Sequence, residues 1–245
     1  MPFLIPLLLI AQALTIETVL PPVQGNVDAF VKSLPDFVCT ERVFSTTTKN
    51  GKLEHELRME SQFRGRQIRR VGFSFVESRV PIAIYGRPAL KGEKPPAGTT
   101  FAGGFSSVLD VSFSSEYARF QTYRLAGKEM VDGREMLVIL FETLPEETAL
   151  AFGWEGKRVV TRDRGKGLID PATMRVLKVE RTYSGLPAKA VLTFTVDYAP
   201  VQIGGKEYLM PKTVRAVMDR KSEHVVYVAE YSDYKKFEVT SGIVN

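Results

Sequence analysis

Residues 37–60 read FVCTERVFSTTTKNGKLEHELRME, and this stretch decides the fold class. Its first half is rich in Val, Phe and Thr, which favour strands, and it ends at an Asn-Gly pair at positions 50–51. Asn-Gly is the strongest two-residue signal for a β-hairpin. After the turn the side chains alternate, and one face carries Leu53, His55, Leu57 and Met59. The stretch therefore predicts an antiparallel hairpin with one buried and one solvated face.

The segments on either side of this hairpin predict a helix and a further strand. Upstream, residues 24–34 place apolar side chains at helical spacing, with Asn26 as the N-cap and Pro35 ending the helix. Downstream, a third strand is expected, and one of its faces carries Arg69, Val71, Phe73 and Phe75.

The rest of the chain predicts more strands and one short helix. Residues 86–104 are rich in Gly and Pro and are expected to form a long irregular loop, followed by a helix over 105–113. Further strands are expected near 118–126, 136–143, 157–163, 167–170, 174–184, 189–199, 206–219 and 224–238. With about ten or eleven strands and no β-α-β alternation, the fold is predicted to be mainly β (α+β), antiparallel and a single domain.

The first residues predict export. Residues 3–10 form an apolar run that is too short to span a bilayer, and Ala11-Gln12-Ala13 matches the pattern read by signal peptidase. Residues 1–13 are therefore expected to be a cleaved signal peptide, and residues 14–245 to be a soluble periplasmic domain. The alternative is that the apolar run is a buried N-terminal strand or helix.

Composition excludes several kinds of chemistry. The 245 residues carry a net charge of +5 and contain one cysteine and two histidines, which rules out an internal disulfide framework and a cysteine-based zinc cluster. The sequence has no GxSxG, HExxH, CxxC, Walker or GxGxxG motif. No catalytic residue, metal site or cofactor is expected. Cys39 is interpreted as a buried small hydrophobe, His55 as a residue near the core, and His224 as a solvated edge residue.

Two features favour binding over catalysis. The basic cluster at Arg64, Arg66, Arg69 and Arg70 is either a solvated strand face or a contact for anionic lipid headgroups. The expected export argues against nucleic acid as the partner. The 15 Phe and nine Tyr form either a filled core or the lining of a cavity for an apolar ligand, and composition does not separate these alternatives.

Several motifs carry a family resemblance. They are LPDFVCT, GGFSSVLDVSF, GLIDPATMRVLKVE, VDYAPVQIGGKEYLMP and YSDYKKF, which together extend over most of the chain. In their order they resemble the LolA/LolB-like group of periplasmic lipoprotein carriers and receptors. The resemblance implies an unclosed, eleven-stranded half-barrel whose concave face is covered by helices and takes acyl chains without catalysis. The chain departs from the carriers in length and in the long loop at 86–104.

These observations predict a monomeric, non-enzymatic binder of lipid or of a lipidated protein, in contact with other envelope proteins. Acyl chains are expected to contact Phe73, Phe75, Phe105, Leu109, Phe113 and Phe141, with the helix at 105–113 as a lid. Arg69 and Arg70 are expected to meet a headgroup. One alternative is an interaction or sensor module of the envelope with a filled core. Another is an enzyme that uses His55 or Cys39.

Overall fold

The computed structural model describes most of the chain. The described residues are 14–70, 73–95, 100–101, 104–105, 107–148, 150–154 and 156–237, and the side chains of 68–70 and 73–75 are left out. The expected signal peptide at residues 1–13 lies outside the described residues. Within the described ranges, no helix is both long enough and apolar enough to cross a bilayer.

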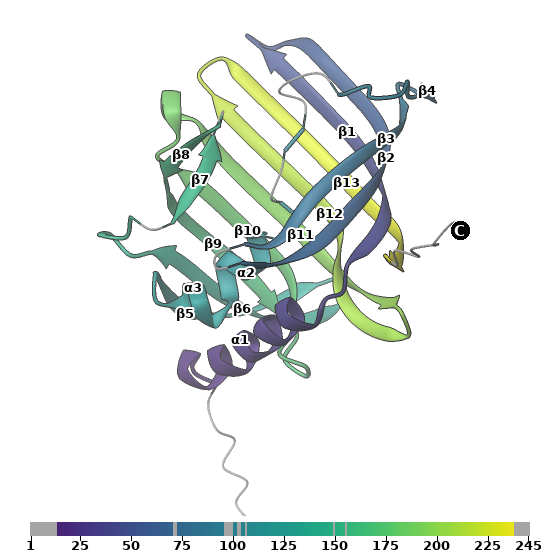
Figure 1. Ribbon diagram of the computed structural model, residues 1–245. Helices are drawn as coiled ribbons and strands as arrows, with labels where there is room; N and C mark the ends of the chain where they lie inside the picture. The colour runs from purple at the N-terminus through teal and green to yellow at the C-terminus, as the bar shows by residue number, and fades with distance from the viewer. Residues whose placement is uncertain are drawn as a thin grey trace, which may run out of the picture.

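The described part of the chain contains one large antiparallel sheet that does not close into a barrel. From edge to edge its strands are β4 (Arg87–Pro88), β3 (Phe73–Ile84), β2 (Lys52–Arg70), β1 (Phe37–Lys49), β13 (Glu223–Lys236), β12 (Lys206–Arg220), β11 (Val191–Ile203), β10 (Val176–Ser184), β9 (Arg162–Ile169), β6 (Arg134–Thr143) and β5 (Gln121–Val131). A separate pair consists of β7 (Ala151–Trp154) and β8 (Lys157–Val160). This arrangement confirms the mainly β fold and the open half-barrel (Figure 1).

Tight turns join the long strands, as the sequence predicts. Asn50 and Gly51 both have positive φ angles, of 50° and 75°, which is the backbone of the type I′ turn that favours Asn-Gly. Asp132 and Gly133 repeat this backbone between β5 and β6, with φ angles of 48° and 76°. The hairpin predicted at Asn50-Gly51 is thus confirmed, and its turn chemistry recurs elsewhere in the sheet.

The core lies on the concave face of the sheet. In β11 the alternate residues Leu192, Phe194, Val196 and Tyr198 are buried, as the period-two pattern predicts. In β2 the same pattern holds for Leu57 and Met59, which are buried.

The pattern fails at the start of β2. Leu53 is 60% exposed and His55 is exposed, so their expected burial is wrong. The register between β1 and β2 shifts between Thr47 and Thr48, and this end of the hairpin extends beyond the core.

The first helix begins earlier than the sequence predicts. Helix α1 covers Ile16–Ser33, so Asn26 lies inside it and is not its N-cap. Thr15 precedes the helix, and its backbone N–H donates to Thr18 Oγ1 at 3.1 Å. Pro21 and Pro22 lie within the helix, where each removes a backbone hydrogen-bond donor. Burial offsets this loss, because three valines at four-residue spacing pack against the core: Val19, Val23 and Val27.

The expected third strand is present as β3, but it begins only at Phe73, so the placement of Arg69 on it is wrong, and Val71 lies outside the described residues. Strand β2 continues to Arg70, β3 begins at Phe73, and the two pair antiparallel with Arg70 opposite Phe73. The chain therefore reverses direction inside the segment that the period-two pattern treats as one strand.

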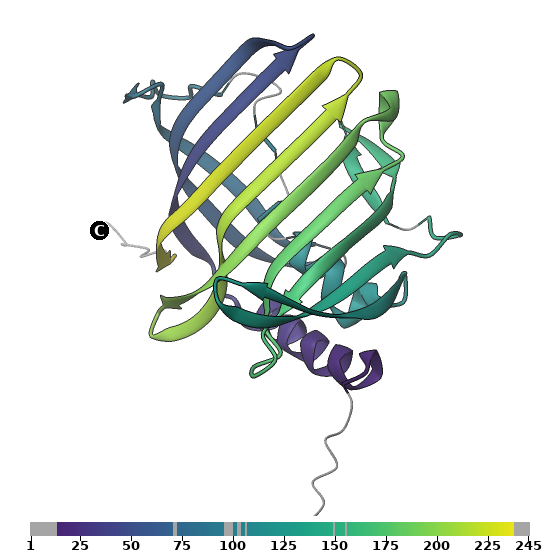
Figure 2. The ribbon, with the colours of Figure 1, turned by 180° about the vertical axis from the view of Figure 1, so that it is seen from behind.

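Short helices occupy the concave side, while the strands form the convex side (Figures 1 and 2). Helix α2 (Ser107–Phe113) confirms the expected helix near 105–113, and α3 (Ser115–Ala118) follows it directly. The expected loop at 86–104 contains β4, and its Phe101 ring packs 5.7 Å from that of Tyr227 on β13. A short 3₁₀ turn, Pro187–Lys189, joins β10 to β11.

Candidate functional site

An aromatic cluster occupies the concave face near α1. The Phe105 ring, just before α2, lies 4.7 Å from the Phe63 ring, 4.8 Å from Tyr231 and 5.5 Å from Phe37. Phe37 packs over the backbone of Gly65 so closely that a Cβ there would lie 2.4 Å from the ring. These rings come from strands β1, β2 and β13, so Phe105 joins the segment before α2 to one side of the half-barrel.

A small cavity lies between this cluster and α1. Its volume is about 10 Å³, which is room for about one water molecule. Its lining consists of Phe30, Val31, Leu34, Phe37, Phe63, Gly65, Glu77, Phe105, Leu109 and Tyr198. The Tyr198 hydroxyl is buried and has no hydrogen-bond partner among the described residues. The concave face at this point is therefore closely packed.

A larger groove of about 180 Å³ opens on the surface beside α1. Its lining consists of Asn26, Val27, Ala29, Phe30, Ser33, Leu109, Arg175, Val176, Glu207, Tyr208 and Leu209. Apolar side chains with a few polar groups are the usual lining of a ligand site. Phe30 and Leu109 line both the groove and the small cavity, so these two side chains separate the surface from the aromatic interior.

Polar contacts hold α1 over the end of the sheet. The Asn26 side-chain amide donates to the carbonyls of Thr173 and Met174 at 3.0 Å each, in the turn before β10. The Tyr208 hydroxyl donates to the Ser33 carbonyl at 3.2 Å. Both contacts lie at the groove, so moving α1 to widen the groove requires breaking them.

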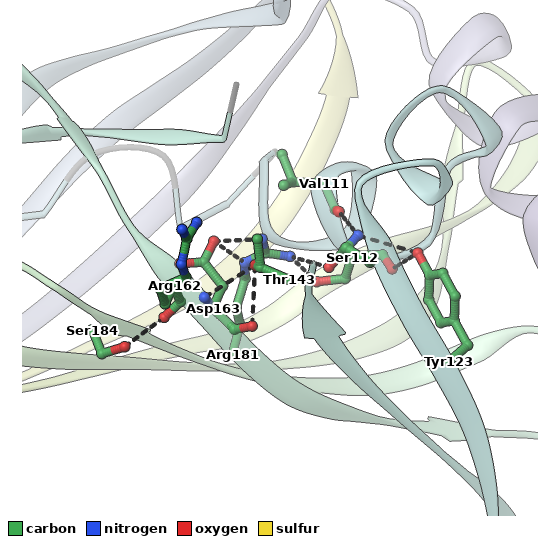
Figure 3. Close-up of polar contacts among 9 residues, drawn as sticks. Val111, Ser112, Tyr123, Thr143, Arg162, Asp163, Arg181 and Ser184 are labelled. Atoms are coloured by element: carbon green, nitrogen blue, oxygen red, sulfur yellow. Dashed lines mark hydrogen bonds and ion pairs between the residues drawn. The ribbon is translucent and has the colours of Figure 1, made fainter. Parts of the chain in front are cut away.

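A buried arginine anchors α2 to the sheet (Figure 3). Arg181 on β10 is fully buried and donates from Nη2 and Nε to Asp163 Oδ2 at 2.6 and 3.2 Å. Its Nη1 donates to Ser112 Oγ on α2 at 3.1 Å and to Gln121 Oε1 on β5 at 3.4 Å. The guanidinium also lies 5.4 Å from the centre of the Phe141 ring, within reach of a cation–π contact.

Strand β5 satisfies the free carbonyls at the end of α2. The last carbonyls of a helix have no partner within it. Gln121 Nε2 donates to the Val111 carbonyl at 2.7 Å, and the Tyr123 hydroxyl donates to the Ser112 carbonyl at 2.9 Å (Figure 3). Burial raises the pKa of the Tyr123 hydroxyl, which keeps it protonated as a donor.

Glycines on β9 form the surface on which α2 rests. A Cβ at Gly167 would lie 2.4 Å from Phe113 Cζ, and a Cβ at Gly165 would lie 2.5 Å from Phe141 Cζ. The rings of Phe113 and Phe141 meet edge to face at 5.5 Å between centroids. The apolar side of α2 therefore fits a surface from which side chains are missing.

A second buried charge lies on the other side of the half-barrel. Glu41 on β1 is fully buried and accepts hydrogen bonds from Ser61 Oγ at 2.7 Å, Arg79 Nε at 2.9 Å and the Tyr231 hydroxyl at 2.9 Å. Burial first, and then the Glu41 carboxylate, raises the pKa of the Cys39 thiol above its usual value. This pKa favours the neutral thiol, which is unsuited to nucleophilic attack.

The structure brings together part of the expected ligand site. Phe105 and Leu109 line the same cavity, and Phe113 and Phe141 contact each other. All four are buried. The side chains of Phe73, Phe75, Arg69 and Arg70 lie outside the described residues.

Other site residues were missed by the sequence reasoning. Phe30 belongs to the apolar face of the helix expected at residues 24–34, and the sequence pattern does not single out Arg181. Arg181 could have been found from its spacing. It alternates with Val179 and Tyr183 on the buried face of β10, where a charged side chain is unusual.

Both histidines lie at the surface. His55 is exposed, and His224 Nδ1 pairs with Asp219 Oδ1 at 2.7 Å on the surface. In the part of the chain that the structure describes, no three His, Cys, Asp or Glu side chains group in a way that could hold a metal ion.

The chain is similar to several solved structures. A DUF1329 family protein from Desulfovibrio piger has a TM-score of 0.47 at 14% identity, over 92% of this chain and 95% of that one. A putative outer membrane lipoprotein-sorting protein domain from Vibrio parahaemolyticus has 0.40 at 13%, over 90% and 92%. A LolA superfamily protein from Nitrosomonas europaea has 0.38 at 14%, over 95% and 98%. No protein-family model and no curated protein matches the chain.

Proposed function

We propose that the chain is a non-catalytic binding protein for an apolar ligand, namely lipid or the acyl chains of a lipoprotein. One observation carries this proposal: Phe30 and Leu109 form a shared wall between the surface groove beside α1 and the aromatic interior. An acyl chain that lies in the groove and moves this wall gains contact with the rings behind it. Each buried CH₂ group contributes about 0.8 kcal/mol toward this insertion, so the gain grows with the length of chain that is buried.

The groove is an entrance to a larger site. At about 180 Å³ it is smaller than the pockets of roughly 300–1,000 Å³ that hold small molecules. A long acyl chain therefore needs α2 to move away from the glycines of β9. The acyl chain would then contact four apolar side chains: Phe105, Leu109, Phe113 and Phe141. In this proposal α2 is the lid, and Arg69 and Arg70 at the end of β2 meet an anionic headgroup.

The expected location agrees with this role. A signal peptide at residues 1–13 would deliver the chain to the periplasm, where lipids and lipidated proteins must cross an aqueous space. Binding there requires no reaction, and the buried neutral thiol of Cys39 and the exposed His55 offer no activated nucleophile or base.

A second function keeps one observation in its favour. The cavity under α1 has a volume of only about 10 Å³, as expected if side chains fill the core. A filled core suits an interaction or sensor module of the envelope. In that case lipid would not load, and partners would recognise the outer surface alone.

Blocking the groove separates the two functions. Ala29 is exposed and lines the groove, so Ala29→Trp fills the groove without disturbing the core. Leu90→Trp is the matched control, because Leu90 is 71% exposed and is not part of the groove lining. The proposal predicts that a fluorescent fatty acid titrated into the protein binds the wild type and Leu90→Trp equally, and Ala29→Trp much more weakly. Equal binding by all three proteins, or binding by none, would count against it.

A further inference from the structure

Strand β3 presents an open edge of the sheet. On one side it pairs with β2 along most of its length, but on the other side β4 pairs only with Ala83 and Ile84. Next to these, the Ile82 carbonyl accepts a hydrogen bond from the Ala89 N–H. Among the described residues, no strand pairs with the outer edge of residues 76–80. Unpaired backbone groups along an edge are a template for an additional strand.

The side chains of this edge that face outward carry no charge. Natural edge strands are commonly blunted by outward-facing lysines, by Pro, by β-bulges and by inward-pointing charges, which an added strand must meet with opposite charges. Among residues 76–80 of β3 the outward-facing positions are Val76 and Val80, which are 45% and 46% exposed, and Ser78 between them. The charged residues between them, Glu77 and Arg79, are turned inward, with only 8% and 18% of their side chains exposed. The edge is therefore both open and uncharged on its outer face.

The opposite edge of the sheet is different. Strand β5 carries Lys128 and Glu129, which form ion pairs with Glu135 at 2.6 Å and with Lys166 at 3.1 Å. Such charges discourage strand addition. If a strand adds to this sheet, the chemistry favours β3.

The sequence of this edge is complementary to itself. Residues 76–80 read Val-Glu-Ser-Arg-Val. When two copies are laid antiparallel about Ser78, Val76 of each chain faces Val80 of the other, and Glu77 of each chain faces Arg79 of the other. The valines pair on the outer face, and opposite charges pair on the inner face.

We propose that a second copy of this chain pairs with the first along β3, antiparallel and centred on Ser78, to make a two-fold symmetric dimer. Such an interface is isologous and uses the open edge of both chains, so assembly stops at two copies. Arg79 already contacts Glu41 at 2.9 Å and Glu77 of its own chain at 3.6 Å, and the second copy brings another carboxylate to it. This inference replaces the expectation of a monomer and is independent of lipid binding.

The first test is the oligomeric state of the full chain by sedimentation equilibrium. The wild type is expected to sediment as a dimer. Val80→Lys places an ammonium group opposite a valine and is expected to weaken association by at least about tenfold. Because Val80 is exposed, the circular dichroism spectrum and thermal midpoint should not change. Val191→Lys is the matched control, since Val191 is 40% exposed on the inner strand β11, and it should leave the dimer intact. A monomeric wild type, or a Val80→Lys variant that associates as tightly as the wild type, would overturn the proposal.

The second test is the register. Residues directly opposite one another in an antiparallel pair lie about 4.5–5.5 Å apart at Cα, which suits a disulfide. Ser78→Cys should therefore cross-link to itself under mild oxidation, whereas Val76→Cys should cross-link only to Val80→Cys in a mixture. The native thiol does not interfere, because Cys39 is buried. Glu230→Cys, exposed on the inner strand β13, is the control for random collision. Cross-linking of Ser78→Cys that is no faster than that of Glu230→Cys would refute the register.

Discussion

Replacing Arg181 by methionine tests the contact that holds α2 to the sheet. The side chain of Arg181 is fully buried, and it supplies two hydrogen bonds to Asp163, one to Ser112 and one to Gln121. Methionine fills a similar volume but carries neither the charge nor the donors. Asp163 Oδ1 already has no partner among the described residues, so Arg181→Met leaves the whole carboxylate without a charged donor.

The magnitude follows from this uncompensated charge. Breaking a buried ion pair by removing one partner costs about 3–5 kcal/mol, and we expect Arg181→Met to lower the free energy of unfolding by about that amount. The double variant Arg181→Met/Asp163→Leu is the control. It removes both charges, and replacement of a whole buried pair by apolar residues is often neutral or stabilising, so most of the stability should return.

Urea denaturation followed by circular dichroism measures both variants, and hydrogen exchange locates the effect. The amides of α2 should exchange faster in Arg181→Met than in the wild type, because the helix loses its link to β10. A loss below about 1 kcal/mol in the single variant would refute the reasoning, since it would mean that the carboxylate finds other partners. A double variant as unstable as the single one would refute it equally.

Three further predictions concern the interior. Gly167→Ala places a Cβ 2.4 Å from Phe113 Cζ and should destabilise the fold by about 1–3 kcal/mol in urea, whereas Gly153→Ala, which meets nothing within 4 Å, should not. Burial, and then Glu41, raises the pKa of Cys39, so a thiol reagent at mildly alkaline pH should modify it only after unfolding; rapid labelling of native protein would contradict this. Burial also raises the pKa of Tyr231 well above its ordinary value, so its contribution to stability is complete below about pH 10 and is lost at higher pH. Ultraviolet absorbance should therefore show tyrosinate forming together with alkaline unfolding, and ionisation of all tyrosines well before unfolding would contradict this.

Local signals in the sequence account for most of the fold. The Asn-Gly pair at 50–51 and the Asp-Gly pair at 132–133 fix turns through backbone angles that few other residues adopt. Period-two burial in β11 follows from the same local alternation. These features need no knowledge of distant residues, which is why the strands and their antiparallel arrangement were predictable, whereas the open half-barrel was implied only by the family resemblance.

The predictions are wrong where tertiary contacts, or the exact position of a turn, determine where an element begins or ends. The start of α1 depends on burial of Val19 and Val23, which outweighs the prolines at 21 and 22, and no local rule measures that burial. Only two positions separate Arg70, at the end of β2, from Phe73, at the start of β3. The alternation of side chains therefore continues across the reversal and does not reveal it. The glycine at position 72 is the one local signal of a turn there. The groove depends on where α1 rests across distant strands.

Native mass spectrometry with lipid tests the central claim most directly, namely that the groove beside α1 leads an apolar ligand into the half-barrel. The protein is incubated with vesicles of phosphatidylethanolamine and phosphatidylglycerol, separated from them, and its mass is measured under native conditions. The account predicts that the wild type carries one lipid per chain, whether the chain is monomeric or dimeric, and that Ala29→Trp loses this lipid while Leu90→Trp retains it. A wild type that never carries lipid, or an Ala29→Trp variant that carries as much lipid as the wild type, would contradict it.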